Sequence, residues 1–135
     1  MLHRTKKQND ENHDKWIGVG GKFEYGETPY ECAIREIAEE TGLVPNKLDY
    51  RGIVTFVSDE YGTEYMHLFT CSDFEGEIKC DCDEGELVFV DKEEIQNLPL
   101  WEGDKVFFSL LDTRRDFFSL KLVYKGETLI SYKVE

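Results

Sequence analysis

Apolar residues recur every three or four positions between residues 28 and 42, which is the spacing of an amphipathic helix. The segment opens with the signals of a helix N-terminus: Thr28 as N-cap, Pro29 in the first helical position, and Glu31 three residues after Thr28. Gly42 is a natural C-terminal stop. The pattern therefore predicts a helix over Thr28–Gly42. Its predicted apolar face comprises Tyr30, Ala33, Ile34 and Ile37.

Elsewhere the pattern shortens to strand-like runs separated by polar turns. β-Branched and aromatic residues fill residues 50–58 and 63–74, on either side of a turn at Asp59–Gly62, which predicts a hairpin. A second hairpin is predicted over residues 117–134, turning at Lys125–Gly126. The remaining predicted elements are strands at residues 2–7, 16–23 and 86–90, an acidic loop at residues 80–86, and helices at residues 91–99, ending at Pro99, and 104–115.

This order of elements predicts the fold class. Helices are interspersed with mostly non-parallel strands, which is typical of an α/β (α+β) fold with a mixed β-sheet sandwiched between helices. A chain of 135 residues has the length of one ordinary domain. We therefore expect residues 1–135 to form a single domain.

The net charge adds a constraint on partners. The chain has 16 Lys and Arg against 29 Asp and Glu, a formal net charge of −13. Such a surface repels a nucleic-acid backbone, which argues against a DNA or RNA polymer as partner. A small phosphate substrate remains compatible if divalent cations mediate its binding. No apolar run suits a membrane span, no signal peptide opens the chain, and the four cysteines lack zinc-site spacing. We therefore expect a soluble, cytoplasmic protein with no membrane partner.

Three glutamates crowd the end of the predicted helix. Glu36, Glu39 and Glu40 fall within one arc of the flank opposite the apolar face. The Glu36–Glu40 pair costs about 0.2–0.5 kcal/mol as like charges one turn apart. The negative end of the helix dipole opposes each charge by about 0.3–1 kcal/mol. A divalent cation such as Mg²⁺ would offset both terms, because it takes carboxylate oxygens as ligands. The alternative interpretation is a solvated acidic face.

The residues before the helix favour the metal interpretation. Three glycines would let the backbone approach a ligand closely. Lys22 follows them and supplies a cation that could meet a phosphate. Glu27 and Arg35 could form an ion pair that ties this loop to the helix. The glycines are Gly18, Gly20 and Gly21.

Residues 21–43 read GKFEYGETPYECAIREIAEETGL. They match every defined position of the Nudix box, G-x5-E-x7-R-E-U-x-E-E-x-G-U, in which U is an aliphatic residue. Through most of its length the chain resembles MutT-like members of the Nudix hydrolase family in the order of its elements. The fold of that family begins with a strand before the one predicted at residues 2–7, so the resemblance implies either that the start of the sequence is misplaced or that the usual first strand is lacking here. The sheet edge left open would then be covered by a second copy in a homodimer.

The resemblance implies a hydrolase that uses Mg²⁺ or Mn²⁺ and a water nucleophile to cleave a nucleoside diphosphate linked to another group. The three box glutamates, Glu36, Glu39 and Glu40, would be the catalytic metal ligands, one of them also serving as general base. The Gly20 carbonyl would complete the coordination. Glu27 and Arg35 would brace the loop and the helix. The family often uses a further acid from a later loop. The candidates here are Asp81, Asp83 and Glu84, of which Glu84 is favoured, and the alternative is a solvated acidic loop.

The resemblance also suggests a substrate, a small nucleotide. In MutT-like enzymes that hydrolyse oxidised purine triphosphates, a Trp with nearby acids contacts the base, and Trp101 and Asp104 resemble these residues. We therefore expect cleavage of a nucleoside triphosphate such as 8-oxo-dGTP to monophosphate and pyrophosphate. A departure is Ile17, where some of these enzymes carry an Asn that reads the base. Dinucleoside polyphosphates, for which Tyr61 is a weak indicator, nucleotide sugars, and a catalytically silent nucleotide sensor remain the alternatives.

Overall fold

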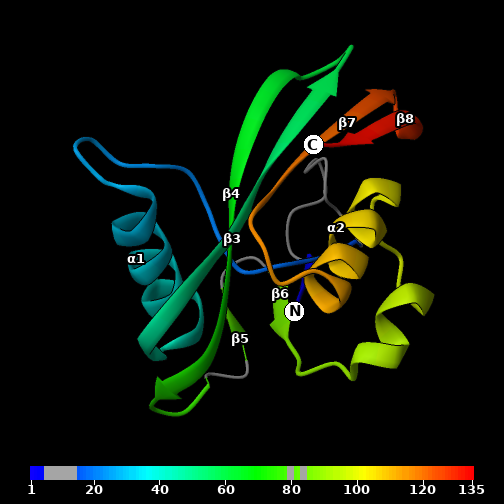
Figure 1. The fold of residues 1–135 in the computed structure, drawn as a ribbon. Coiled ribbons are helices and arrows are strands. Elements are labelled where there is room, and N and C mark those ends of the chain that lie inside the picture. Colours follow the sequence, from blue (N-terminus) through cyan, green and yellow to red (C-terminus); the bar gives the residue numbers. More distant parts are fainter. Residues whose placement is uncertain (5–14, 79–80, 83–84) are drawn as a thin grey trace. The chain divides into compact units, whose positions relative to one another are not determined.

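A computed structural model describes residues 1–4, 15–78, 81–82 and 85–135 (Figure 1). Contacts divide the chain into two compact units. The first unit consists of residues 1–48 and 71–100, and the second of residues 49–70 and 101–135. Two long strands, β3 (Val44–Ser58) and β4 (Gly62–Glu75), contribute residues to both units.

The first unit contains an antiparallel sheet in the order β2-β1-β6-β5. Leu2 of β1 pairs with Ile17 of β2 on one side and with Leu87 of β6 on the other. In addition, the Trp16 N–H of β2 donates a hydrogen bond to the Pro99 carbonyl over 3.0 Å. The strands are β1 (Leu2–Arg4), β2 (Trp16–Ile17), β5 (Asp81–Cys82) and β6 (Gly85–Leu87), and a 3₁₀ helix, η1 (Lys92–Asn97), follows them.

Helix α1 (Pro29–Thr41) of the first unit confirms the predicted helix and its ends. The Thr28 hydroxyl accepts from the Glu31 N–H over 3.1 Å, and the Glu31 carboxylate accepts from the Thr28 N–H over 3.0 Å. These reciprocal bonds form a capping box. Gly42 ends the helix at φ 79°, a left-handed conformation that favours glycine.

The predicted apolar face of α1 is wrong in part. Tyr30 and Ile34 are each 45% exposed, whereas the buried residues of the helix are Cys32 and Thr41. Residues 18–27, the glycine loop that precedes the helix, explain why Cys32 is buried. Its thiol lies 3.6 Å from the Lys22 carbonyl, so the loop covers the side of the helix that carries it.

The second unit is built on strand β7 (Phe118–Lys125), which alternates strictly between buried and more exposed positions. It pairs in parallel with β3, from Gly52↔Phe118 to Ser58↔Tyr124, and antiparallel with β8 (Thr128–Val134). Helix α2 (Glu102–Thr113) adds Phe107 to the core. The most deeply buried core side chains are Val54, Phe118, Leu120 and Leu122.

The α+β class is confirmed, and so are both predicted hairpins. The sheet β4-β3-β7-β8 is mixed. Strands β3 and β7 pair in parallel, whereas β7 and β8 pair antiparallel as a hairpin. The described strands, however, form two sheets rather than one. Among the described residues, no helix has the length and apolar character needed to cross a membrane.

Several predicted boundaries need correction. Strand β3 begins at Val44 rather than at residue 50. It neighbours β4 in the sheet, and near its start the Asn46 side-chain amide donates to the Asp73 carboxylate over 3.0 Å. The predicted acidic loop contains β5. Backbone hydrogen bonds to β6 hold this strand, so it forms without an apolar pattern that would have indicated it in the sequence. The strand predicted over residues 16–23 ends at Ile17, before the glycines.

Candidate active site

The loop before α1 and the glutamates of that helix lie against each other. The Glu40 carboxylate accepts a hydrogen bond from the Gly20 N–H over 3.1 Å. A Cβ atom placed on Gly21 would lie 2.4 Å from Glu36 Oε1, closer than real Cβ contacts allow. A side chain at position 21 would therefore displace the Glu36 carboxylate from the place that it occupies beside the loop. Two box carboxylates thus face the backbone of the glycine loop.

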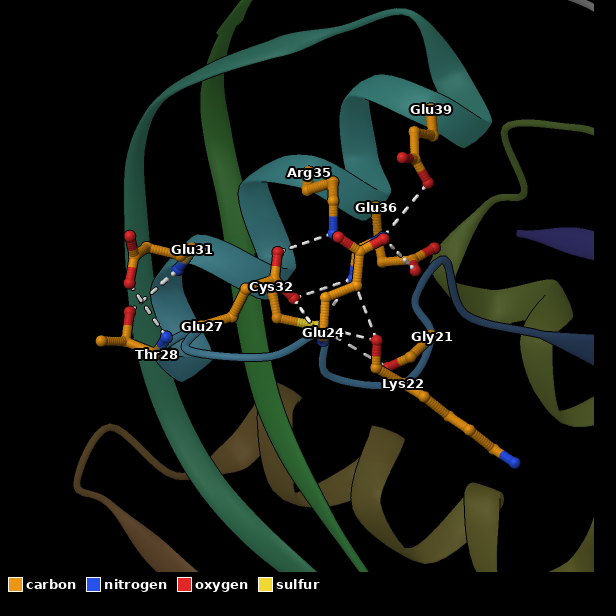
Figure 2. A network of polar contacts seen from close by, with 10 residues as sticks. All are labelled: Gly21, Lys22, Glu24, Glu27, Thr28, Glu31, Cys32, Arg35, Glu36 and Glu39. Atoms are coloured by element: carbon orange, nitrogen blue, oxygen red, sulfur yellow. Dashed lines mark hydrogen bonds and ion pairs between the residues drawn. The ribbon is translucent and has the colours of Figure 1, made fainter.

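Arg35 ties this loop to the helix (Figure 2). Its Nε and Nη2 atoms donate to the two oxygens of Glu27, over 2.6 and 2.9 Å, which is a bidentate pair. Nη2 also donates to the Lys22 carbonyl over 2.9 Å. The ion pair expected from the sequence is therefore present, and it holds both ends of the loop.

The third nitrogen of the same guanidinium faces the acids of the helix. Nη1 lies 2.8 Å from Glu36 Oε1, 3.2 Å from Glu39 Oε2 and 3.5 Å from Glu24 Oε1. With Glu27, one cation therefore contacts four carboxylates, and the cluster keeps an excess of negative charge. Sequence reasoning missed Glu24, and its signal was its place inside the loop that the ion pair closes.

The contacts within this cluster shift the pKa values of Glu27 and Arg35. Hydrogen bonds from Arg35, and then from the Glu24 N–H, hold the pKa of Glu27 at about 2, well below its ordinary value of 4.5. Hydrogen bonds to Glu27 and then Glu36 raise the pKa of Arg35 above its ordinary value. Both groups therefore stay charged at every pH at which the protein would work.

Cys32 is a second residue whose position sequence reasoning missed. Its thiol lies within 3.8 Å of the Gly21 carbonyl and 3.6 Å of the Lys22 carbonyl, on the side of α1 covered by the loop. Burial, and then the charge of Glu27, raises the pKa of this thiol. The side chain therefore supports the loop as a neutral thiol. Its position one helical turn before Arg35 was the available signal.

The box residues suit a hard divalent cation in their chemistry. Glu36, Glu39 and Glu40 all offer carboxylate oxygens, the ligand type that Mg²⁺ and Mn²⁺ take. In the part of the chain that the structure describes, no three acidic, histidine or cysteine side chains converge on one metal point. Arg35 Nη1 lies between Glu36 and Glu39 and contacts both. A cation shared by these two glutamates would bind beside that contact or displace it, because each carboxylate has two oxygens.

Other predicted site residues lie outside this cluster. The Lys22 side chain points away from the carboxylates in Figure 2, while its carbonyl accepts from Arg35. Its phosphate-binding role stays a prediction. Glu84 lies outside the described residues, as does its neighbour in the acidic loop, Asp83. Trp101 and Asp104 belong to the second unit, where Trp101 precedes α2 and Asp104 is buried in its first turn.

Comparison with known proteins identifies the class. The model of the NUDIX domain matches residues 1–111. The chain therefore belongs to the Nudix family. The intact box, the fold and the relatives described next make it a MutT-like Nudix hydrolase, an enzyme that acts on nucleotide-type substrates.

Curated relatives and a solved structure agree with this class. The chain is 30% identical over 125 residues to the uncharacterised Nudix hydrolase YvcI of Bacillus subtilis, covering 89% of this chain and 79% of that protein. It is 31% identical over 124 residues to the oxidised purine nucleoside triphosphate hydrolase of Danio rerio, covering 90% and 78%. It is 37% identical over 95 residues to the ADP-ribose pyrophosphatase of Methanocaldococcus jannaschii, covering 70% and 54%. The crystal structure of a MutT protein from Bacillus halodurans superposes with a TM-score of 0.87 at 27% identity, covering 99% of this chain and 87% of that one.

Proposed function

We propose that this protein is a divalent-metal-dependent pyrophosphohydrolase that cleaves oxidised purine nucleoside triphosphates to the monophosphate and pyrophosphate. The observation that carries the proposal is the complete box cluster, in which Arg35 and the glycine loop hold the α1 glutamates in one place. The 31% identity to an oxidised purine nucleoside triphosphate hydrolase supports the substrate class.

In this proposal Glu36, Glu39 and Glu40, with the Gly20 carbonyl, hold Mg²⁺ or Mn²⁺. Such an ion, when bound, neutralises phosphate charge and lowers the pKa of a water. One of the three carboxylates would accept the proton from the attacking water. Arg35, held by Glu27, would keep the loop and the helix at a fixed separation, so that the carbonyl and carboxylates stay oriented.

Lys22, Trp101 and Asp104 would bind the rest of the nucleotide. Lys22 is exposed and could meet a phosphate oxygen. Trp101 would stack on the base and Asp104 would accept a hydrogen bond from the purine edge. Ile17 would pack against the substrate without hydrogen bonding, so base reading would depend on the second unit more than in relatives with an Asn there.

A second candidate is hydrolysis of ADP-ribose or a related nucleoside diphosphate derivative. The 37% identity to an ADP-ribose pyrophosphatase favours it, although that match covers 70% of this chain. The box chemistry is the same for both candidates, because each requires cleavage of a phosphoanhydride beside bound metal. The base and the group beyond the diphosphate would differ.

A product assay with Mg²⁺ separates the candidates. The panel comprises 8-oxo-dGTP, the four ordinary dNTPs, ADP-ribose and diadenosine tetraphosphate, with Glu39→Gln as the inactive control. The highest kcat/KM for 8-oxo-dGTP, with pyrophosphate as product, is the expected result. Faster hydrolysis of ADP-ribose or the dinucleotide would replace the substrate assignment and keep the enzyme class. Turnover of the panel by Glu39→Gln at the wild-type rate would contradict the assigned chemistry.

A further inference from the structure

Helix α2 begins with an unusual residue at its N-cap. Ser, Thr, Asp and Asn are favoured there because their side chains accept a hydrogen bond from the first turn. Trp101 holds this position in α2 and makes no side-chain capping bond. An indole has a donor but no acceptor, so this residue type is unable to cap a helix. The first N–H groups of α2 must therefore find acceptors elsewhere.

Tyr124 of strand β7 supplies one of them. The Gly103 N–H donates to the Tyr124 hydroxyl over 2.6 Å, at a site where both residues are buried. A Cβ atom on Gly103 would lie 2.5 Å from Leu122 Cδ1 and 2.6 Å from the same hydroxyl. Glycine at position 103 thus allows the helix to approach the strand closely enough for this bond. Burial raises the pKa of Tyr124 to about 12, so the hydroxyl stays neutral at physiological pH.

The ring of Tyr124 also contacts the tryptophan. Trp101 meets it edge-on, with ring centroids 5.6 Å apart and an interplanar angle of 86°. Phe56 of β3 stacks with the same ring at 6.4 Å and 21°. A single side chain therefore orients the Trp101 ring and the backbone that leads into Asp104. The Glu102 carboxylate adds a second tie, since it accepts from the Leu129 N–H over 2.8 Å.

We infer that Tyr124 is the positioning residue that determines base selectivity, because its hydroxyl and ring fix Trp101 and Asp104 at the start of α2. This inference rests on the proposed function, in which those two residues contact the purine. Loss of the hydroxyl would leave the Gly103 N–H without that acceptor and would loosen the turn that carries both residues. Discrimination between bases would fall, while the chemistry at the phosphates would not change.

The test compares Tyr124→Phe with wild type, using Tyr132→Phe as the matched control and Trp101→Leu as the reference for lost base contact. Tyr132→Phe removes the same group, a tyrosine hydroxyl, from the neighbouring strand β8. Tyr132 is 58% exposed, whereas Tyr124 is buried. We would measure kcat and KM with 8-oxo-dGTP and with dGTP. Tyr124→Phe is expected to raise KM for 8-oxo-dGTP about 3- to 10-fold at unchanged kcat, and to reduce the preference over dGTP by a similar factor. Tyr132→Phe should match wild type.

Amide hydrogen exchange at Gly103 provides a readout that needs no substrate. Faster exchange at Gly103 in Tyr124→Phe, with α1 amides unchanged, is the expected result and shows that the variant is folded. Unchanged exchange and unchanged selectivity would overturn the inference. If Trp101→Leu alters selectivity while Tyr124→Phe does not, the inference fails and the proposed function stands. If wild type hydrolyses neither nucleotide, both fail together.

Discussion

Arg35 has the most demanding geometry among the residues of the box cluster. It donates two parallel hydrogen bonds to Glu27, and its third nitrogen forms an ion pair with Glu36 of α1. Arg35→Lys keeps the charge but loses the fork, since an ammonium acts as a point charge. We expect kcat to fall about 10- to 100-fold with the fold intact. Steady-state kinetics and circular dichroism would check this, with exposed Arg115→Lys as control. A kcat within twofold of wild type would contradict the role given to Arg35.

The box glutamates provide the sharpest residue-scale prediction. Glu39→Gln and Glu40→Gln each remove a proposed metal ligand but keep the size of the side chain. We expect turnover to fall by at least about 100-fold, because charge stabilisation at the phosphates is lost. Glu31→Gln is the matched control, since Gln also serves in a capping box. Wild-type turnover in both Glu39→Gln and Glu40→Gln would refute the assignment of these ligands.

Spacing along the chain was sufficient to place the box glutamates on one helix and to pair Arg35 with Glu27. The i,i+4 spacing also indicates the contact of Arg35 with Glu39, but spacing was not sufficient to predict that Nη1 contacts Glu36 and Glu24, because that depends on side-chain rotamers. The support given by Cys32 was hidden for a different reason. Its neighbours in the sequence, Glu31 and Ala33, do not indicate that the loop covers it, and only its place one turn before Arg35 does.

At the scale of elements, α1 was predictable because its boundary signals are local. Thr28, Glu31 and Gly42 act within a few residues of themselves, and each makes the contact its type suggests. Strands β3 and β5 were mispredicted because pairing with another strand determined their extent. The cap of α2 was likewise hidden, since it comes from Tyr124, 21 positions away from Gly103.

The capping box of α1 has a measurable stability. Thr28→Ala removes the hydroxyl that accepts from the Glu31 N–H. We expect the free energy of unfolding to fall by about 1 kcal/mol. Urea titration would measure it. The control is Ser109→Ala, which removes an exposed hydroxyl from the interior of α2, where it caps no helix end. A loss equal to that of the control would show that the cap contributes nothing to the stability of the molecule.

At the scale of the whole molecule, the −13 charge makes acid pH informative. The pKa of Glu27 is about 2 in the folded state and near its ordinary 4.5 when unfolded. The unfolded chain therefore binds the proton first as pH falls, so the contribution of Glu27 is complete above about pH 5 and is lost toward pH 2. Protonation of other acids relieves repulsion over the same range, which masks this loss in wild type alone.

The difference between wild type and Glu27→Gln isolates that contribution. We expect the stability difference to be constant from about pH 7 to 5 and to shrink as pH falls toward 2. Chemical denaturation at several pH values would measure it. Glu77→Gln, which changes an exposed acid of the same unit, is the matched control. A Glu27→Gln difference that stays constant down to pH 2 would contradict the Arg35 pairing.

The same excess charge predicts how the whole protein responds to metal. A cation that binds the folded state in preference to the unfolded one stabilises it by about 2.7 kcal/mol at 100 times its Kd. Mg²⁺ should therefore raise Tm by several degrees, and EDTA should reverse the rise. General screening of −13 charges would also raise Tm, but NaCl at equal ionic strength would reproduce that part. The excess over NaCl should disappear in Glu36→Gln, whose carboxylate lies against Gly21. If Mg²⁺ and NaCl act equally on wild type, the acids of α1 bind no specific cation, and their cost to the helix would need a different explanation.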